Sequence, residues 1–121
     1  RAVSVSIGGF HCLALTGSGA IWSWGQGGLS ALGHGDQQQD QCQPTKVEAL
    51  AEQRIIAVSA GRVHSLALTS NGEVWSWGWG RLGHGDEEEQ PLPKKVEALA
   101  GRRVVAVSPA LGHSLALTAD G

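Results

Sequence analysis

The chain has 121 residues, of which 41% are hydrophobic and 17% are charged, and its 9 basic and 11 acidic side chains give a formal net charge of −2. This composition is typical of a packed globular protein, and the near-balance of charge argues against binding to the phosphate backbone of nucleic acids. No apolar run reaches the length of a membrane span, so membrane insertion is not expected. Glycine is the outlier, because its 18 residues are about twice the average usage.

Internal repetition determines the predicted architecture. The motif His-x-Leu-Ala-Leu-Thr begins at His11, His64 and His113, and the motif Trp-Ser-Trp-Gly begins at Trp22 and Trp75. The chain therefore divides into two full repeats and a partial third. Their predicted bounds are residues 1–53, 54–102 and 103–121.

The apolar residues of each repeat alternate with a period of two, which predicts short strands. In the second repeat these strands are expected over residues 54–59, 64–69 and 74–78, with a tight turn at residues 70–72. One repeat is predicted to form about four short antiparallel strands, which is the size of a propeller blade. No segment has the pattern of an amphipathic helix.

The second repeat carries the run Val-Ser-Ala-Gly-x-x-His-Ser-Leu-Ala-Leu-Thr-x-x-Gly-x-Val-Trp-Ser-Trp-Gly over residues 58–78, followed by Leu-Gly-His-Gly-Asp and Val-Glu-Ala-Leu. These motifs resemble the regulator-of-chromosome-condensation repeat over essentially the whole chain. The resemblance implies an all-β fold, a β-propeller of about seven blades with roughly fifty residues each. It also implies that glycines serve tight turns and that the His-Ser-Leu-Ala-Leu and Trp-Ser-Trp strands pack blade against blade.

The chain would supply about two and a half of these four-stranded antiparallel blades, and so looks like part of a larger domain. Such an open stack leaves apolar blade faces and strand edges without neighbours. The isolated chain is therefore expected to aggregate, to oligomerise or to be poorly ordered.

Five histidines at repeat positions raise the question of a metal site. They are His11, His34, His64, His84 and His113. Their spacing gives no i,i+4 pair, and no Cys-x-x-Cys motif accompanies them. Each is expected to hydrogen-bond a neighbouring backbone group, and no metal is expected. The run Gly78–Gly83 matches Gly-x-Gly-x-x-Gly, but the His-Gly-Asp that follows breaks the helix that a dinucleotide site needs, so no cofactor is expected.

The two cysteines, Cys12 and Cys42, are too few for a disulfide framework. Cys12 aligns with serine in the other repeats and is expected to be a small buried side chain in a reducing, intracellular protein. A disulfide between the two cysteines is the less favoured alternative. Four tryptophans at equivalent strand positions are expected to fill the core or the space between blades. They are Trp22, Trp24, Trp75 and Trp77.

Two features break the repeat and are candidate partner contacts. Trp79 has Gln26 as its counterpart, and an exposed Trp79 at the propeller rim would anchor an interface; local packing is the alternative. The acidic run from Asp86 to Glu89 replaces Asp36-Gln-Gln-Gln39, and it is either a solvated loop or a contact for a basic partner surface. The predicted contact residues are Trp79, Arg81, Asp86, Glu87, Glu88 and Glu89.

Catalysis finds no support, because the chain has no Gly-x-Ser-x-Gly elbow and no carboxylate pair stands apart from the loop acids. The first hypothesis is a non-catalytic interaction module that docks on other proteins within a multi-subunit assembly. The resemblance implies two alternatives. One is a guanine-nucleotide exchange factor for a small GTPase, although no insertion of the size of that factor's wedge is present. The other is the recognition domain of a HECT-type ubiquitin ligase.

Overall fold

The computed structural model describes most of the first two repeats and two strand segments of the third. The described residues are 1–26, 31–34, 41–79, 82, 89–97, 104–109 and 114–118, with the side chains of 41, 42, 105–109 and 114–118 left aside. Ten antiparallel strands lie within these ranges and form three sheets. The predicted all-β fold is confirmed. No helix among these residues has the length and apolar character needed to cross a membrane.

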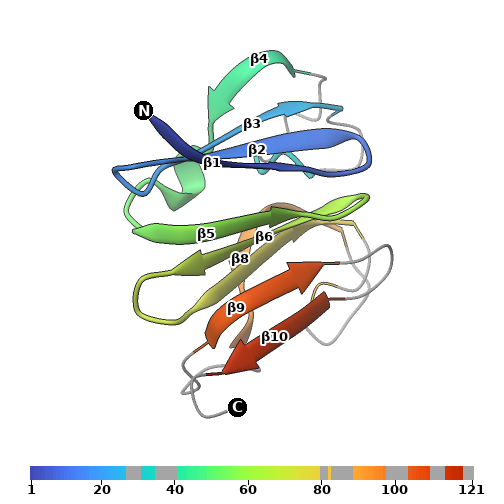
Figure 1. The fold of residues 1–121 in the computed structure, drawn as a ribbon. Coiled ribbons are helices and arrows are strands. Elements are labelled where there is room, and N and C mark those ends of the chain that lie inside the picture. The colour runs from blue at the N-terminus through green and yellow to red at the C-terminus, as the bar shows by residue number, and fades with distance from the viewer. Residues whose placement is uncertain are drawn as a thin grey trace.

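Three sheets lie one after another in a stack (Figure 1). The first has the order β1 (Ala2–Ile7), β2 (His11–Thr16), β3 (Ile21–Gly25) and β4 (Gln41–Lys46), and the single-turn 3-10 helix η1 (Glu48–Leu50) follows it. The second has the order β5 (Ile55–Ala60), β6 (His64–Thr69), β7 (Val74–Gly78) and β8 (Gln90–Lys95). The third contains β9 (Val104–Pro109) and β10 (Ser114–Thr118).

Equivalent residues of the repeats form equivalent pairs at the same places in their sheets. His11 pairs with Gly25 in the first sheet, and His64 pairs with Gly78 at the same place in the second. The first strand pair of every sheet also has one irregularity near its start, and β9 and β10 repeat it. The alternation with a period of two therefore sends equivalent residues to equivalent faces in every sheet.

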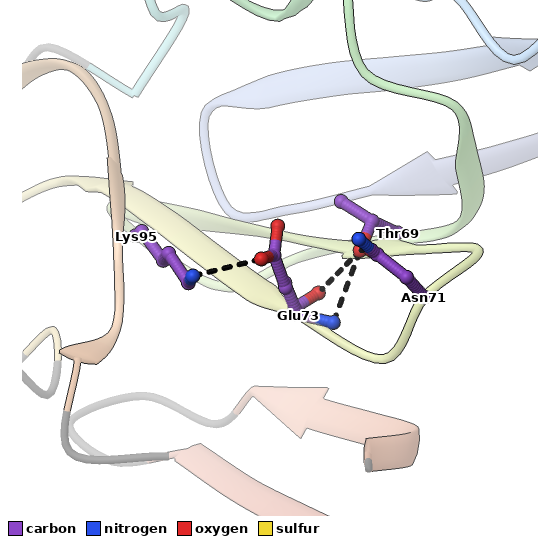
Figure 2. A network of polar contacts seen from close by, with 4 residues as sticks. All are labelled: Thr69, Asn71, Glu73 and Lys95. Carbon is purple, nitrogen blue, oxygen red and sulfur yellow. Dashed lines mark hydrogen bonds and ion pairs between the residues drawn. The ribbon is translucent and has the colours of Figure 1, made fainter. Parts of the chain in front are cut away.

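A threonine organises the hairpin turn between the second and third strands of a sheet. Figure 2 shows this turn in the second sheet, where the Thr69 hydroxyl donates to Asn71 Oδ1 and accepts the Glu73 N–H at 3.0 Å. Gly72 supplies a φ of 87° in the turn, as the Asn-Gly sequence predicts. Lys95 Nζ binds Glu73 Oε2 at 2.7 Å and joins the turn to β8. In the first sheet, Thr16 plays the same part and its hydroxyl accepts the Ala20 N–H.

Consecutive sheets are linked through the main chain. The N–H of Ile55, which begins β5, donates to the carbonyl of Gly19 at 3.2 Å. The N–H of Val104, which begins β9, donates to the carbonyl of Gly72 at the same 3.2 Å. Gly19 and Gly72 hold the same place in their respective turns. Each turn is therefore hydrogen-bonded to the start of the first strand of the next sheet.

The main core lies between the first and second sheets. The first sheet and η1 contribute one aliphatic face to it, made of Leu13, Leu15, Ile21, Val47 and Leu50. The second sheet covers this face with Ile55, Ala67 and Trp77, and with the partly buried Val58, Ala60 and Trp75. A second cluster repeats the arrangement, because Leu66, Leu68, Val74 and Val96 pack with Val104 of β9. The prediction that the His-Ser-Leu-Ala-Leu and Trp-Ser-Trp strands pack blade against blade is confirmed.

The tryptophan prediction is right for one sheet and wrong for part of the other. Trp77 is fully buried, but Trp22 leaves 36% of its surface exposed. Trp75, the counterpart of Trp22, packs against the first sheet. Trp22 points to the side of the first sheet that faces away from the second sheet, and no described sheet packs against it.

Candidate interaction surface

The joint between the first two sheets is built around the carbonyl of Ala31, which lies after β3. Ser65 Oγ donates to this oxygen at 2.8 Å, and Trp77 Nε1 donates to it at 2.9 Å. Both donors come from the second sheet and both side chains are fully buried. The two lone pairs of one carbonyl therefore accept both of these side-chain hydrogens.

His11 completes the joint. Its Nε2 lies 2.8 Å from Ser65 Oγ. Because Ser65 has one hydroxyl hydrogen and gives it to Ala31, His11 Nε2 carries a hydrogen and donates it to Ser65. Burial lowers the pKa of His11 from 6.5 to about 4, and the charge of His64 acts in the same direction against a smaller opposing contact with the His64 backbone. His11 is neutral at pH 7, and its buried Nδ1 has no hydrogen-bond partner.

A histidine beside a serine could form a nucleophile–base pair, but the geometry here gives the opposite roles. A general base must accept the serine hydrogen, whereas His11 donates to Ser65. His11 is 2% exposed and Ser65 is fully buried, so no substrate reaches the pair. The pair fastens the two sheets together.

The same pattern recurs inside the first sheet. Ser23 Oγ donates to the carbonyl of Leu32 at 2.8 Å, and His34 Nε2 lies 2.9 Å from that hydroxyl. His34 therefore also donates, and burial lowers its pKa as well. The expected histidine partners were backbone groups, and this is wrong for His11 and His34, because a serine hydroxyl stands between each ring and the carbonyl. His84 and His113 lie outside the described residues.

Within the described part of the chain, no three His, Cys, Asp or Glu side chains lie close enough together to hold a metal ion.

Cys12 has a free thiol and is only half-buried, so the prediction of a buried Cys12 is wrong. Its counterpart Ser65 is buried by the first sheet, and no described sheet covers Cys12 in that way.

Trp79 lies at one end of the second sheet, directly after β7. Its N–H donates to the carbonyl of Val63 at 3.0 Å, which fixes the backbone, while its side chain remains 52% exposed. Gly78 makes this approach feasible. It has a φ of 110°, and a Cβ there would lie 2.6 Å from the same Val63 oxygen. The first sheet has the equivalent bond from Gln26 N–H to the carbonyl of Phe10, at 2.9 Å.

Phe10 and Arg62 lie at this same end of the two sheets. The Arg62 guanidinium stands over the Phe10 ring with 5.8 Å between Cζ and the ring centroid, which is within cation–π range. Gly9 N–H donates to the carbonyl of Gly61, so the turns that carry the two residues are joined. We call Phe10, Arg62 and Trp79 the rim patch. All three are exposed, Phe10 to 42%.

The predicted contact residues fall into two groups. Trp79 and Glu89 are described and exposed, with Glu89 directly before β8. Arg81, Asp86, Glu87 and Glu88 lie outside the described residues. Phe10 and Arg62 were missed, although both interrupt the repeat. Phe10 is the only phenylalanine and aligns with Val63, and Arg62 aligns with Gly9.

The stack of like sheets, the shared register and the repeated joints define a class of protein, the repeat proteins whose sheets are propeller blades. The chain belongs to the regulator of chromosome condensation (RCC1) repeat family. The family's repeat matches residues 18–68 and 71–117, and a second form of it matches residues 2–29 and 55–83.

Relatives and solved structures agree with this assignment. The human E3 ubiquitin-protein ligase HERC2 is 42% identical over 93 residues, which is 74% of this chain and 2% of HERC2. Human WBSCR16 matches 100% of this chain and 32% of its own, with 31% identity and a TM-score of 0.86. Prp20p of Saccharomyces cerevisiae matches 100% of this chain and 31% of its own, with 31% identity and a TM-score of 0.85. The chain thus spans about a third of these two structures and a small part of HERC2.

Proposed function

We propose that this chain provides blades of an RCC1-type propeller that acts as a non-catalytic interaction module, docking on other proteins within a larger intracellular assembly. The observation that carries the proposal is the division of roles among its side chains. The serine and histidine side chains at the Ala31 joint are buried and hydrogen-bonded within the stack. The aromatic side chains of the rim patch face outward at one end of two blades.

The chemistry of the rim patch suits a protein partner. Tryptophan and arginine are the residue types that contribute most binding energy at protein interfaces. Prp20p, which has this fold and is 31% identical to this chain, binds Gsp1p and histones, and this similarity supports a protein partner. The acidic run at residues 86–89, of which Glu89 is described and exposed, supports a partner with a basic surface.

The test is direct binding of the full chain to two purified probes, a core-histone dimer and a small GTPase of the Gsp1p type. We expect Trp79→Ala to weaken binding about tenfold or more, as the loss of an anchor residue does. Ile56→Ala is the matched control, because Ile56 is 51% exposed and lies at the end of β5 opposite the turn that carries Arg62. Equal effects of the two substitutions, or no binding of either probe, would overturn the proposal.

An exchange factor for a small GTPase is the second candidate, favoured by the similarity to Prp20p. It predicts that the chain accelerates nucleotide release from the GTPase probe. Accelerated nucleotide release would contradict the non-catalytic role and support the exchange factor. Binding of the GTPase without accelerated release would support the non-catalytic role. The similarity to HERC2 favours a third candidate, a recognition domain within a ubiquitin ligase, which also makes the chain a non-catalytic binding module.

A further inference from the structure

Asn71 is the only asparagine in the chain, and a glycine follows it in the turn between β6 and β7. Asparagine is one of the thermolabile residues of proteins. Its side-chain amide is most reactive before glycine, because no side chain shields the main-chain nitrogen that attacks it. Asn71 is also exposed to solvent. The turn therefore contains both groups that spontaneous deamidation requires.

The reaction replaces the Asn71 amide with a carboxylate in two steps. Solvent base removes the Gly72 N–H proton, and the nitrogen forms a bond to Asn71 Cγ while Nδ2 takes up a proton from water and leaves as ammonia. The product is a cyclic succinimide, and water then opens its ring. Opening at Cγ gives aspartate. Opening at the main-chain carbonyl carbon gives isoaspartate, in which the main chain runs through Cγ and is longer by one methylene group.

The folded turn restrains both reacting groups. The Gly72 N–H donates to the Thr69 carbonyl at 3.1 Å, so the nitrogen must give up a hydrogen bond before it can attack. The Thr69 hydroxyl donates to Asn71 Oδ1 and accepts the Glu73 N–H at 3.0 Å, which ties the amide to the turn (Figure 2). A group held in this way reacts through the open population of its turn.

The same turn carries the link to the third sheet. The carbonyl of Gly72 accepts the N–H of Val104 at 3.2 Å. An isoaspartate at position 71 would lengthen the main chain directly before Gly72 and displace this carbonyl from the N–H. The turn of the first sheet is not subject to this reaction, because Ser18 holds the position of Asn71. The Ser18 hydroxyl lies 2.9 Å from the Thr16 hydroxyl, so it keeps the contact with the threonine.

We infer that Asn71 is a site of spontaneous deamidation, that opening of the turn at residues 69–73 limits its rate, and that conversion to isoaspartate breaks the link between the second and third sheets. Water is the co-reactant. The inference is independent of the rim patch and of the proposed function.

The first test follows the conversion of Asn71 in the full chain by peptide mapping and mass spectrometry at mildly alkaline pH. The native chain should deamidate about tenfold or more slowly than the same chain in guanidinium chloride, where the turn is open. Thr69→Ala should accelerate the native reaction about fivefold, because the contacts of the hydroxyl are lost. Thr69→Ser is the matched control, since it keeps the hydroxyl and should react at the wild-type rate. Equal rates in the native and denatured chains, or no conversion in the denatured chain, would overturn the inference.

The second test compares amide hydrogen exchange at the two links between sheets before and after ageing. In the converted chain the Val104 N–H should exchange about tenfold faster than in the fresh chain, because its acceptor has moved. The Ile55 N–H, which donates to Gly19, should be unchanged.

Asn71→Ser is the matched control for ageing, because it places the residue of the first turn in the second. Ageing should leave both amides of this variant unchanged. Unchanged exchange at Val104 in the converted wild-type chain, or faster exchange there in aged Asn71→Ser, would overturn the effect assigned to isoaspartate.

Discussion

Replacement of Trp77 by phenylalanine is expected to lower the free energy of unfolding by about 2 kcal/mol. The indole Nε1 donates to the Ala31 carbonyl at 2.9 Å, and the side chain is fully buried. Loss of the hydrogen bond accounts for about 1 kcal/mol. The carbonyl keeps the Ser65 donor, so no buried acceptor is left without a partner. The smaller ring leaves a cavity of about 40 Å³, which costs about 1 kcal/mol more.

Trp24 is the matched control, because it holds the same repeat position in the first sheet. It is only half-buried, and no described sheet lies against its face. Trp24→Phe is therefore expected to change the free energy of unfolding by less than about 0.5 kcal/mol. Both variants are measured by urea unfolding followed by circular dichroism at the same low protein concentration. Equal losses for the two variants would refute the assignment of this energy to the joint between sheets.

Three further predictions concern stability. The unfolded chain protonates His11 near pH 6.5 and the folded chain near pH 4, so stability is full above pH 6.5 and falls by about 3 kcal/mol as the pH approaches 4. Gly78→Ala should cost at least about 2 kcal/mol from its positive φ and its close approach to a carbonyl, whereas Gly17→Ala should be nearly neutral. Thr69→Ala should cost about 1 kcal/mol by removing the hydroxyl that organises the turn.

Each of these has its own control. Urea unfolding at a series of pH values should show a flatter profile for His11→Gln, and an unchanged profile would contradict the role given to His11. For the glycines, the two alanine variants should differ in thermal midpoint, and similar midpoints would contradict the steric argument. Thr69→Ser keeps the hydroxyl and should retain most of the stability lost in Thr69→Ala; if it does not, the methyl group and not the hydrogen bonds stabilises the turn.

The strands were predictable because they depend on patterns within a single repeat. Alternation over His64–Thr69 and the Asn71-Gly72 turn fix a strand and a hairpin whatever lies beside them. The same alternation places Leu66 and Leu68 on one face of the second sheet and Trp75 and Trp77 on the other. The motif repetition also predicts that successive sheets use equivalent faces.

What the sequence could not predict depends on the neighbours of a residue in space. Trp22 and Trp75 have the same local sequence, yet only Trp75 packs against another sheet. The partner of His11 is Ser65, which is 54 residues away in the chain, and no local pattern encodes that pairing. The rim patch could have been suspected in part, because Phe10 and Arg62 break the repeat. Their closeness in space could not be predicted, because it arises where the turns of two successive blades meet.

The links from Gly19 to Ile55 and from Gly72 to Val104 use main-chain atoms alone. The two glycine carbonyls accept the same hydrogen bond although the residues whose N–H groups donate it, isoleucine and valine, differ. A unit of this kind is interchangeable, since a duplicated or deleted repeat would meet the same carbonyl and the same N–H at its boundaries. Gene duplication could therefore change the number of blades without any compensating substitution at these links. The length of such a stack is then limited by the packing of its faces and by ring closure.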